Sequence, residues 1–312
     1  MRVLIPIDGG ADCREAIRFV TSRKSWLENQ KPQIELLYVQ KPYIEHPMEE
    51  GDFDIQSWYY DDKIKAVFED MAEDIATLPE NVIKTSKIGH PAKVIASYAR
   101  EIGADLIVMG ARGLSALKNL YLGSVSLGTI ARAACPVLVC REHYTPKDEN
   151  LKIGIAVDGS GFGDLCTKFA VQNKDLFGTD ASFEVIYVHA DEETVPSELL
   201  DKGVLELDKL LPKYEQKEYT NAVESPLAQL KAAGLKAKPV ELRGSLQTTL
   251  THYADENLNM VVMGSHGKGR ISSLVFGSST RAMVASCRMP IFIVPGSHGK
   301  GRISSLVFGS ST

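Results

Sequence analysis

The sequence has no long hydrophobic run and no excess of positive charge. None of its apolar stretches approaches the roughly 18 residues that a membrane-spanning helix needs. The N-terminus passes directly from a strand-like run to a turn, without the apolar core and cleavage site of a secretory signal. The formal net charge of -5 gives no general attraction to nucleic acid or to an anionic membrane. We therefore expect a cytoplasmic protein with no nucleic-acid partner and no membrane partner.

Cysteine is also scarce, and no two of the five cysteines form a CxxC pair. An odd, scattered set of this kind is typical of reduced thiols in a cytosolic protein. The rest of the composition, 44% hydrophobic and 24% charged, is that of a globular protein able to bury large cores. At 312 residues the chain is about twice the commonest domain size, which indicates two domains.

The two halves of the chain repeat one order of strand-like and helical patterns. Each half opens with a short apolar run that stops at Asp-Gly, at Asp8 in the first half and at Asp158 in the second. Buried parallel strands often stop in this way. Helical and strand-like patterns then alternate until each half closes on a fifth strand, 136–140 or 290–294. This alternation predicts a parallel sheet that helices cover on both faces.

The repeat predicts where the domains lie and how they meet. We expect one domain over 1–143, a polar linker over 144–150 and a second domain over 151–295. Each is predicted to be an α/β domain with a doubly wound, five-stranded parallel sheet of the Rossmann-like type. The fifth strands would lie at sheet edges, and an unpaired apolar edge seeks a partner. We therefore expect the two domains to pair through these edges as a pseudo-twofold monomer, which could dimerise further.

A glycine-rich pattern follows the fourth strand of each half at the same spacing. Its residues are Gly110, Gly113, Gly123 and Ser124 in the first half, and Gly264, Gly267, Gly277 and Ser278 in the second. The first glycine would keep a side chain out of the way of a ligand, and the second could take positive φ and turn N–H groups inward. The Gly-Ser pair would begin a helix, whose free N–H groups favour phosphate. Such a loop can be only a tight turn, but two copies at one spacing favour an anion site.

The pattern G-x2-G-x9-G-[ST], together with the Asp that ends the first strand, resembles the ATP-binding universal stress proteins. The resemblance covers nearly all of residues 1–295, and both copies match at every defining position. It implies an adenine nucleotide alpha hydrolase-like fold and a role in stress response or signalling, with one nucleotide site per domain. The ligand would be ATP, ADP or AMP. A Mg²⁺ ion bridging the phosphates is compatible with it, but the sequence marks no carboxylate as a metal ligand.

The same resemblance implies a role for each matching position. Asp8 and Asp158 would hydrogen-bond the nucleoside, and the backbone of Val39 and of Val188 would recognise the adenine edge. Ribose and phosphates would be held by the glycine-pattern residues and by the backbone of the next residue in each half, which adds Val125 and Ser279 to the eight residues given above. An Asp in a turn after a strand can instead simply accept local backbone N–H groups, and this alternative stays open for both aspartates.

Charged side chains inside the loops give a weaker signal. Arg112 and Lys118, or Lys268 and Arg270, could screen phosphate charge or could be solvated loop cations. His266 could touch phosphate, but the first half has no histidine at the corresponding stretch. We predict no histidine role that the two halves share.

Three other functions fit the sequence less well. A PP-loop adenylating enzyme would need S-G-G-x-D-S where the first half has Asp8 to Cys13, and both serines of that pattern are replaced. A dedicated ATPase is not indicated, because the chain has no G-x4-G-K-[ST] loop and no base marked to activate water. Slow hydrolysis stays open. A nucleotide-independent scaffold is the remaining alternative, which two intact motifs disfavour.

The last segment of the chain is a copy of the second glycine pattern. Residues 296–312 repeat residues 264–280 letter for letter, which indicates a recent duplication or an error in the recorded sequence. No Asp-ended strand and no adenine-binding strand accompany this third copy. We expect a tail rather than a domain or a third site, with a lid near the second site as the alternative.

Overall fold

The structure, a computed structural model, describes residues 1–42, 52–113, 122–142, 144, 146, 150–189, 204–266 and 277–296. The first half contains β1 (Arg2–Ile7), α1 (Ala11–Ser22), α2 (Lys24–Gln30), β2 (Gln33–Gln40), α3 (Asp52–Asp70), α4 (Ala72–Ile75), β3 (Ile83–Ile88), α5 (Pro91–Glu101), β4 (Leu106–Gly110), α6 (Ser124–Ile130) and β5 (Val137–Cys140). The second contains β6 (Lys152–Val157), α7 (Gly161–Gln172), the 3₁₀ turn η1 (Lys174–Phe177), β7 (Ser182–His189), α9 (Val204–Ala232), β8 (Lys236–Arg243), α10 (Leu246–Asn257), β9 (Met260–Gly264), α11 (Ser278–Ser286) and β10 (Ile291–Val294).

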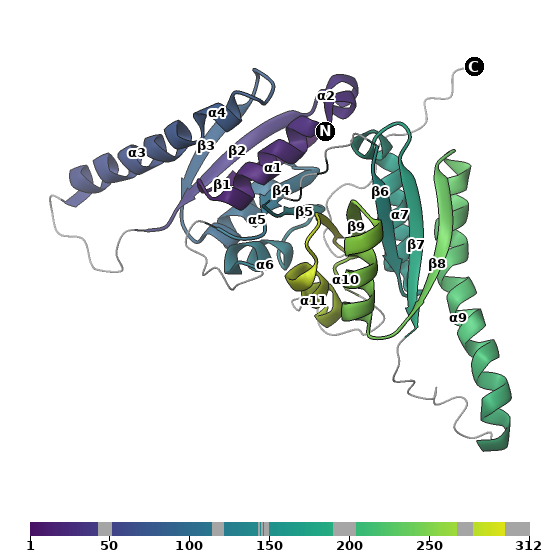
Figure 1. Cartoon of the computed structure of the whole chain (residues 1–312). Coiled ribbons are helices and arrows are strands. Elements are labelled where there is room, and N and C mark those ends of the chain that lie inside the picture. Colours follow the sequence, from purple (N-terminus) through teal and green to yellow (C-terminus); the bar gives the residue numbers. More distant parts are fainter. Residues whose placement is uncertain are drawn as a thin grey trace.

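Each half forms a five-stranded parallel sheet with its first strand in the middle (Figure 1). In the first half β1 lies between β2 and β4, and in the second β6 lies between β7 and β9. Helices α1 and α4 pack on one face of the first sheet, while α5 and α6 pack on the other. The prediction of two tandem, doubly wound Rossmann-like units is therefore confirmed.

The apolar runs form strands that are buried on both faces. In β1, residues Val3 to Ile7 are all buried. Val3, Ile5 and Ile7 belong to the core under α1, and Leu4 belongs to the core under α5. Successive side chains of a strand point to opposite faces, so a strand covered on both sides needs a continuous apolar run.

The two halves join through their fifth strands into one ten-stranded sheet. Strand β5 pairs antiparallel with β10, and Leu138 lies opposite Phe292 in the register. These two residues occupy the same position of the internal repeat, so each pairs with its own counterpart. A pseudo-twofold axis therefore passes between them, as in an isologous dimer interface. The predicted edge-to-edge pairing of the domains is confirmed.

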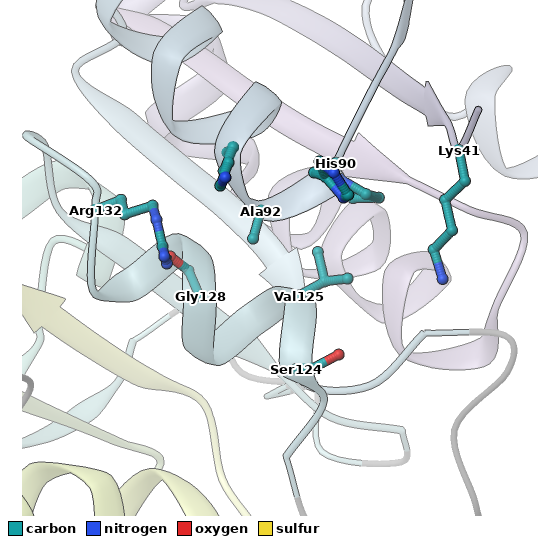
Figure 2. A pocket seen from close by; sticks show the side chains of 9 residues that line it. Lys41, His90, Ala92, Ser124, Val125, Gly128 and Arg132 are labelled. Atoms are coloured by element: carbon teal, nitrogen blue, oxygen red, sulfur yellow. The ribbon is translucent and has the colours of Figure 1, made fainter. Parts of the chain in front are cut away.

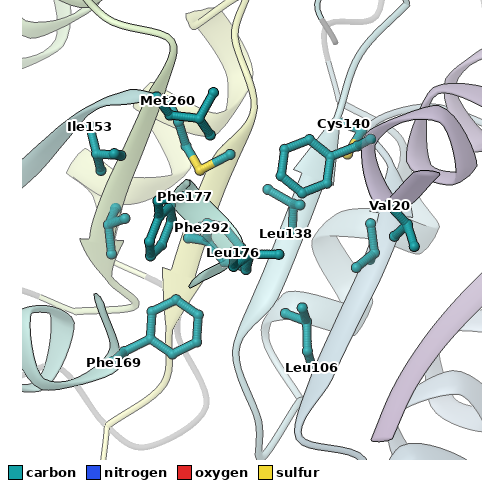
Figure 3. Close-up of a cluster of buried hydrophobic side chains, with 14 of the residues drawn as sticks. Val20, Leu106, Leu138, Cys140, Ile153, Phe169, Leu176, Phe177, Met260 and Phe292 are labelled. Atoms are coloured by element: carbon teal, nitrogen blue, oxygen red, sulfur yellow. The ribbon is translucent and has the colours of Figure 1, made fainter. Parts of the chain in front are cut away.

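Side chains from both halves share the core at this junction (Figure 3). The Phe292 ring lies 5.0 Å from that of Phe169 and 5.9 Å from that of Phe177, measured between centroids. Leu138 and Cys140 extend the same cluster into the first half. Because the apolar core is continuous across the junction, the halves are held by hydrophobic burial as well as by the strand ladder.

Two further contacts between the halves support the junction, and each includes a hydrogen bond. The Arg141 guanidinium donates to the backbone carbonyl of Val284 in α11, and burial lowers its pKa. Helix α2 packs near η1, where Gln30 Nε2 donates to Asp175 Oδ2 at 2.8 Å. The expected boundaries at 143, 150 and 295 stay a prediction.

Helix α9 continues through two prolines. Pro212 and Pro226 both lie inside this 29-residue helix. A proline removes one backbone hydrogen bond and clashes with the preceding turn. Here Pro226 is buried near Gly163 of α7, between the buried residues Val223 and Leu230. Packing against α7 and the sheet offsets the local cost.

Two remaining expectations concern membranes and the C-terminal copy. Within the described residues, no helix combines the length and apolarity needed to cross a membrane. Of the copied segment 296–312, only Gly296 belongs to the described residues, so the expected tail or lid lies outside them.

The junction predicts a difference between two isoleucines in strands. Ile291 in β10 is 1% exposed, and Ile88 in β3 is 52% exposed. The substitution Ile291→Ala should lower the free energy of unfolding by about 2–4 kcal/mol, because it leaves a cavity in the shared core. Ile88→Ala should cost below about 1 kcal/mol, because most of that side chain already contacts water. Urea denaturation followed by circular dichroism measures both; equal losses would contradict the shared core.

Candidate functional site

The aspartates that end the first strand of each half adopt the same turn. Oδ1 of Asp8 accepts the N–H two residues on at 3.0 Å, and Oδ1 of Asp158 does the same at 2.9 Å. The residues between, Gly9 and Gly159, have φ of +84° and +77°, a conformation that favours glycine. The local hydrogen bond that the sequence left open as an alternative is therefore present in both halves, and it fixes the orientation of each carboxylate.

Gly113 brings the glycine loop against Asp8. A Cβ atom placed on Gly113 would lie 2.6 Å from Oδ2 of Asp8, closer than real Cβ contacts. Gly113 is absent from the described glycines with positive φ, so the expectation of positive φ is wrong for this residue. Glycine is needed here for space rather than for backbone conformation. Gly267, its counterpart, lies outside the described residues.

Glycine is required at the ends of β4 and β9 for a steric reason that the sequence did not predict. A Cβ on Gly110 would lie within 2.8 Å of Asp12 and Cys13 backbone or Cβ atoms, so α1 crosses the strand end directly. A Cβ on Gly264 would lie 2.7 Å from Cβ of Phe162, at the start of α7. A side chain at either glycine would therefore displace α1 or α7, and the expectation that it would also block a ligand stays a prediction.

Both glycine loops close on themselves in the same way. The N–H of Gly123 donates to the carbonyl of Ala111 at 2.8 Å, and the N–H of Gly277 donates to the carbonyl of Ser265 at 3.1 Å. Each of these glycines is the N-cap of the next helix, and helices α6 and α11 begin at the predicted serines. The first turn of each helix therefore returns to the end of the fourth strand, as the spacing predicted.

Two hydroxyl residues that the sequence reasoning missed fix this arrangement. Ser126 Oγ donates to the carbonyl of Gly110 at 2.8 Å, and Thr280 Oγ1 donates to the carbonyl of Gly264 at 2.9 Å. Both side chains are buried. The sequence does contain a signal for them, because both copies carry a hydroxyl residue two positions after the serine of the Gly-Ser pair.

In the first half, Asp12 connects the glycine loop to the end of β5. Its carboxylate is buried, and it accepts the Arg112 backbone N–H at 2.9 Å and the Arg112 guanidinium at 2.9 and 3.1 Å. It also accepts the backbone N–H of Glu142 at 2.9 Å. Hydrogen bonding to Asp12 raises the pKa of Arg112. Arg112 is thus not a solvated loop cation, because it has a specific partner within the protein; its role in screening phosphate charge stays a prediction.

In the second half, aromatic rings take the place of this ionic cluster. Phe162 stands at the position of Asp12 in the repeat, and its ring centroid lies 6.0 Å from that of His266, the counterpart of Arg112. The Phe162 ring also fills the space beside Gly264 and beside Gly296, two residues after the last strand. Nδ1 of His266 lies 3.0 Å from Oγ of Ser265. The backbone arrangement is shared by the halves, but the side chains behind it are not.

The structure places Val39 and Val188 at the carboxyl edge of the sheet, each in its own half. Val39 is the second-last residue of β2, which lies next to β1, and Val188 is the second-last residue of β7, which lies next to β6. Both are partly buried against the core under α5 and α10. In parallel sheets the carboxyl ends of neighbouring strands share one edge, so within each half the valine, the aspartate turn and the glycine loop are on the same side. Because β5 and β10 pair antiparallel, the two halves present these edges on opposite sides of the ten-stranded sheet.

A cavity of about 350 Å³ opens beside α6 (Figure 2). Ser124 and Val125 line it, and the other lining residues come from the end of β2, the start of α5 and the rest of α6. Ser124 is exposed and Val125 is partly buried. Of the residues expected to touch nucleotide, these two are the ones in the cavity wall.

Neither metal ligands nor a reactive thiol mark the site. Within the described residues there is no group of three or more His, Cys, Asp or Glu that could hold a metal ion. Cys13, behind the Asp8 turn, donates from Sγ to the carbonyl of Gly10. Burial, followed by the nearby charge of Asp8, raises the pKa of this thiol to about 12. Cys13 is therefore a protonated, structural thiol at neutral pH.

Fold and site together define a tandem α/β protein whose two halves carry the same strand-end loop. The model of the universal stress protein family matches residues 1–141 and again 149–295. The chain belongs to the universal stress protein family. The resemblance first seen in the glycine pattern is confirmed at the level of the family.

Individual relatives are more distant. A universal stress protein of Mycobacterium tuberculosis is 27% identical over 199 residues, which cover 61% of this chain and 61% of the relative. The chain thus spans about three fifths of the length of that relative. A universal stress protein of Bacillus subtilis is 49% identical over 53 residues, 17% of this chain and 36% of the relative. The crystal structure of a universal stress protein from Archaeoglobus fulgidus has a TM-score of 0.59 at 17% identity and covers 94% of this chain and 96% of its own, which shows the shared fold.

The Asp12 cluster predicts a specific loss of stability. Asp12→Ala leaves the Arg112 guanidinium and two backbone N–H groups without their acceptor, and we expect a loss of about 2–4 kcal/mol in the free energy of unfolding. The control Asp62→Ala removes an exposed carboxylate of α3 and should change stability by about 0.5 kcal/mol or less. Denaturant titration of both variants measures the difference. Equal losses would show that Asp12 does not hold the loop.

Proposed function

We propose that this chain is an adenine-nucleotide-binding stress or signalling protein with one site in each half. The residues proposed to contact nucleotide are Asp8, Val39, Gly110, Gly113, Gly123, Ser124 and Val125 in the first half, and Asp158, Val188, Gly264, Gly267, Gly277, Ser278 and Ser279 in the second. ATP is the proposed ligand, with ADP and AMP as its shorter forms. A cytoplasmic setting and a further homodimer belong to the same proposal.

The observation that carries the proposal is the repeated geometry of the strand-end loop. In both halves the fourth strand ends in glycine, the loop returns through one backbone hydrogen bond, and a helix begins at Gly-Ser. In both halves a side-chain hydroxyl ties that helix to the strand end. A loop that served only as a turn would not need the same closure twice. The first N–H groups of a helix have no acceptor within the helix, so an anion at the start of α6 or α11 could accept them.

The aspartate turns support the nucleoside part of the proposal. Asp8 is held by its own turn on one side, and its Oδ2 faces the space that a side chain on Gly113 would fill. A carboxylate fixed in this way is a ready acceptor for ribose hydroxyl groups. Val39 and Val188 lie at the ends of the neighbouring strands, so adenine would bind on the other side of the aspartate from the phosphates.

The same residues support binding rather than dedicated catalysis. Among the described residues of the loops, no histidine or carboxylate occupies equivalent positions in both halves beyond Asp8 and Asp158, and both of these already accept a backbone N–H. A general base must reach the attacking water and must keep an acceptor directed at it. Slow hydrolysis stays the alternative. A Mg²⁺ ion would be held mainly by the phosphates, because no carboxylate cluster awaits it in the described residues.

The proposal predicts how single substitutions change nucleotide stoichiometry. Gly113→Val would place a branched side chain against Asp8 and should remove the first site. Gly277→Val would cover the start of α11 and should remove the second; its Cβ would meet neighbours no closer than 3.4 Å, so the fold should tolerate it. Isothermal titration with ATP should give about two nucleotides per chain in the wild type and about one per chain in each variant.

Two controls keep this experiment decisive. Gly103→Asn changes a glycine with φ of +63° and no neighbour within 4 Å, a conformation that asparagine tolerates, and should leave stoichiometry unchanged. Asp8→Ala removes the first site without adding bulk, which covers the case in which Gly113→Val unfolds. Stoichiometry that is unchanged in all folded variants would overturn the assignment of the sites.

A further inference from the structure

The cavity beside α6 is lined by basic side chains. Its wall carries Lys41 after β2, His90 and Lys93 at the start of α5, and Arg132 after α6. Figure 2 shows Lys41, His90 and Arg132 around the same opening as Ser124 and Val125. No carboxylate belongs to the lining that the structure describes. Three permanent cations and a histidine therefore surround about 350 Å³ of accessible space.

None of these four side chains takes part in an ion pair within the described part of the chain. The ion pairs seen there engage other residues, such as Arg14 with Asp74 and Arg112 with Asp12. Arg132 uses one guanidinium nitrogen to donate to the carbonyl of Gly128 at 2.8 Å, which anchors it beside the cavity. The remaining N–H groups of its planar fork can still serve an oxyanion.

The start of α5 adds one backbone donor to this wall. Helix α5 has eleven residues, and His90, its N-cap, makes no side-chain hydrogen bond to the first turn. Pro91 has no N–H, and the N–H groups of Lys93 and Val94 each donate to the carbonyl of His90 at 3.0 Å, so Ala92 supplies the remaining N–H of the first turn. The positive end of the helix dipole thus lies at the same cavity as the four basic side chains.

At the four equivalent positions, the sequence of the second half carries no charge. The alignment of the halves is fixed by matching hydrogen bonds: Gly89 donates to the carbonyl of Gln40 as Gly244 does to that of His189, each at 2.9 Å. Likewise Arg132 donates to the carbonyl of Gly128 where Ser286 donates to that of Ala282. Counting from these pairs, the counterparts of the four basic residues are Ala190, Ser245, Thr248 and Ser286. None of the four is charged.

We propose that this cavity is a phosphate-chain site that extends the first nucleotide site alone. Ser124 and Val125 belong both to the cavity wall and to the predicted phosphate loop, so a chain of phosphates held at the loop can continue between Lys93 and Arg132. The first site then prefers a nucleotide with several phosphates, while the second site discriminates less between ATP and AMP. As an extension of the nucleotide site this rests on the proposed function; as a site for free polyphosphate it does not.

Nucleotides of different length test the proposal on the full chain. The Gly277→Val background isolates the first site, and AMP and ATP are titrated with and without the pair Lys93→Gln and Arg132→Gln. Each exposed ion pair contributes a few-fold, so the double variant should bind ATP about tenfold more weakly while AMP binding changes less than about twofold. The effect should shrink at high salt, because exposed charges are screened.

A matched control removes the same charge elsewhere. Lys168→Gln with Lys231→Gln changes two exposed lysines of the second half and should leave the ATP-to-AMP ratio unchanged. This control separates local contacts from the effect of net charge.

Inorganic tripolyphosphate identifies the source of the phosphate and separates the two proposals. If AMP and ATP fail to bind but tripolyphosphate binds in a manner that depends on Lys93 and Arg132, the cavity is a free phosphate site and the nucleotide proposal fails alone. If the ATP-to-AMP ratio is the same with and without the two cations, and tripolyphosphate binding does not depend on them, the cavity proposal is overturned whether or not nucleotide binds.

Discussion

The antiparallel pairing of β5 with β10 is the constraint on which the rest of the structure depends. A five-stranded half alone would expose an apolar edge strand, and here each half covers the edge of the other. The pairing also determines where the candidate sites lie. The glycine loops leave β4 and β9, which are the direct neighbours of β5 and β10, so each loop begins one strand away from the junction. Arg141 spans this short distance, since it follows β5 and donates to α11, the helix that begins at the second Gly-Ser pair.

The two halves keep one backbone arrangement and change the side chains that support it. The loop closure, the helix start and the hydroxyl bond of Ser126 or Thr280 occur in both. Behind the loop, an ion pair of Asp12 with Arg112 in the first half corresponds to Phe162 and His266 in the second. Beside α6, basic residues of the first half correspond to uncharged ones in the second. The backbone, the buried hydroxyl groups and the aspartate turns are thus common to both loops, and the side chains behind and beside the loops distinguish the halves.

The sequence predicted the parts of the structure that depend on short-range pattern. Apolar runs, Asp-Gly turns and the x9 spacing led to the parallel order, the helix starts and the paired fifth strands, because each of these follows from local periodicity or from edge chemistry. Contacts between distant segments were not predictable in this way. The acceptor of Arg112 lies 100 residues away at Asp12, and the close approach of α1 to Gly110 joins segments about as far apart. Helix α9 continues through Pro226 because of tertiary packing that local propensity does not contain.

The central claim is that each half holds one adenine nucleotide at the edge where the first and fourth strands end. A crystal structure of the full chain grown with an excess of ATP tests this most directly. The account predicts two nucleotides, each with its ribose at Asp8 or Asp158 and its phosphates at the Gly123 or Gly277 helix start. Only the first would have a phosphate chain that extends towards Lys93 and Arg132. Nucleotide density at another place, or empty strand-end loops at saturating ATP, would contradict it.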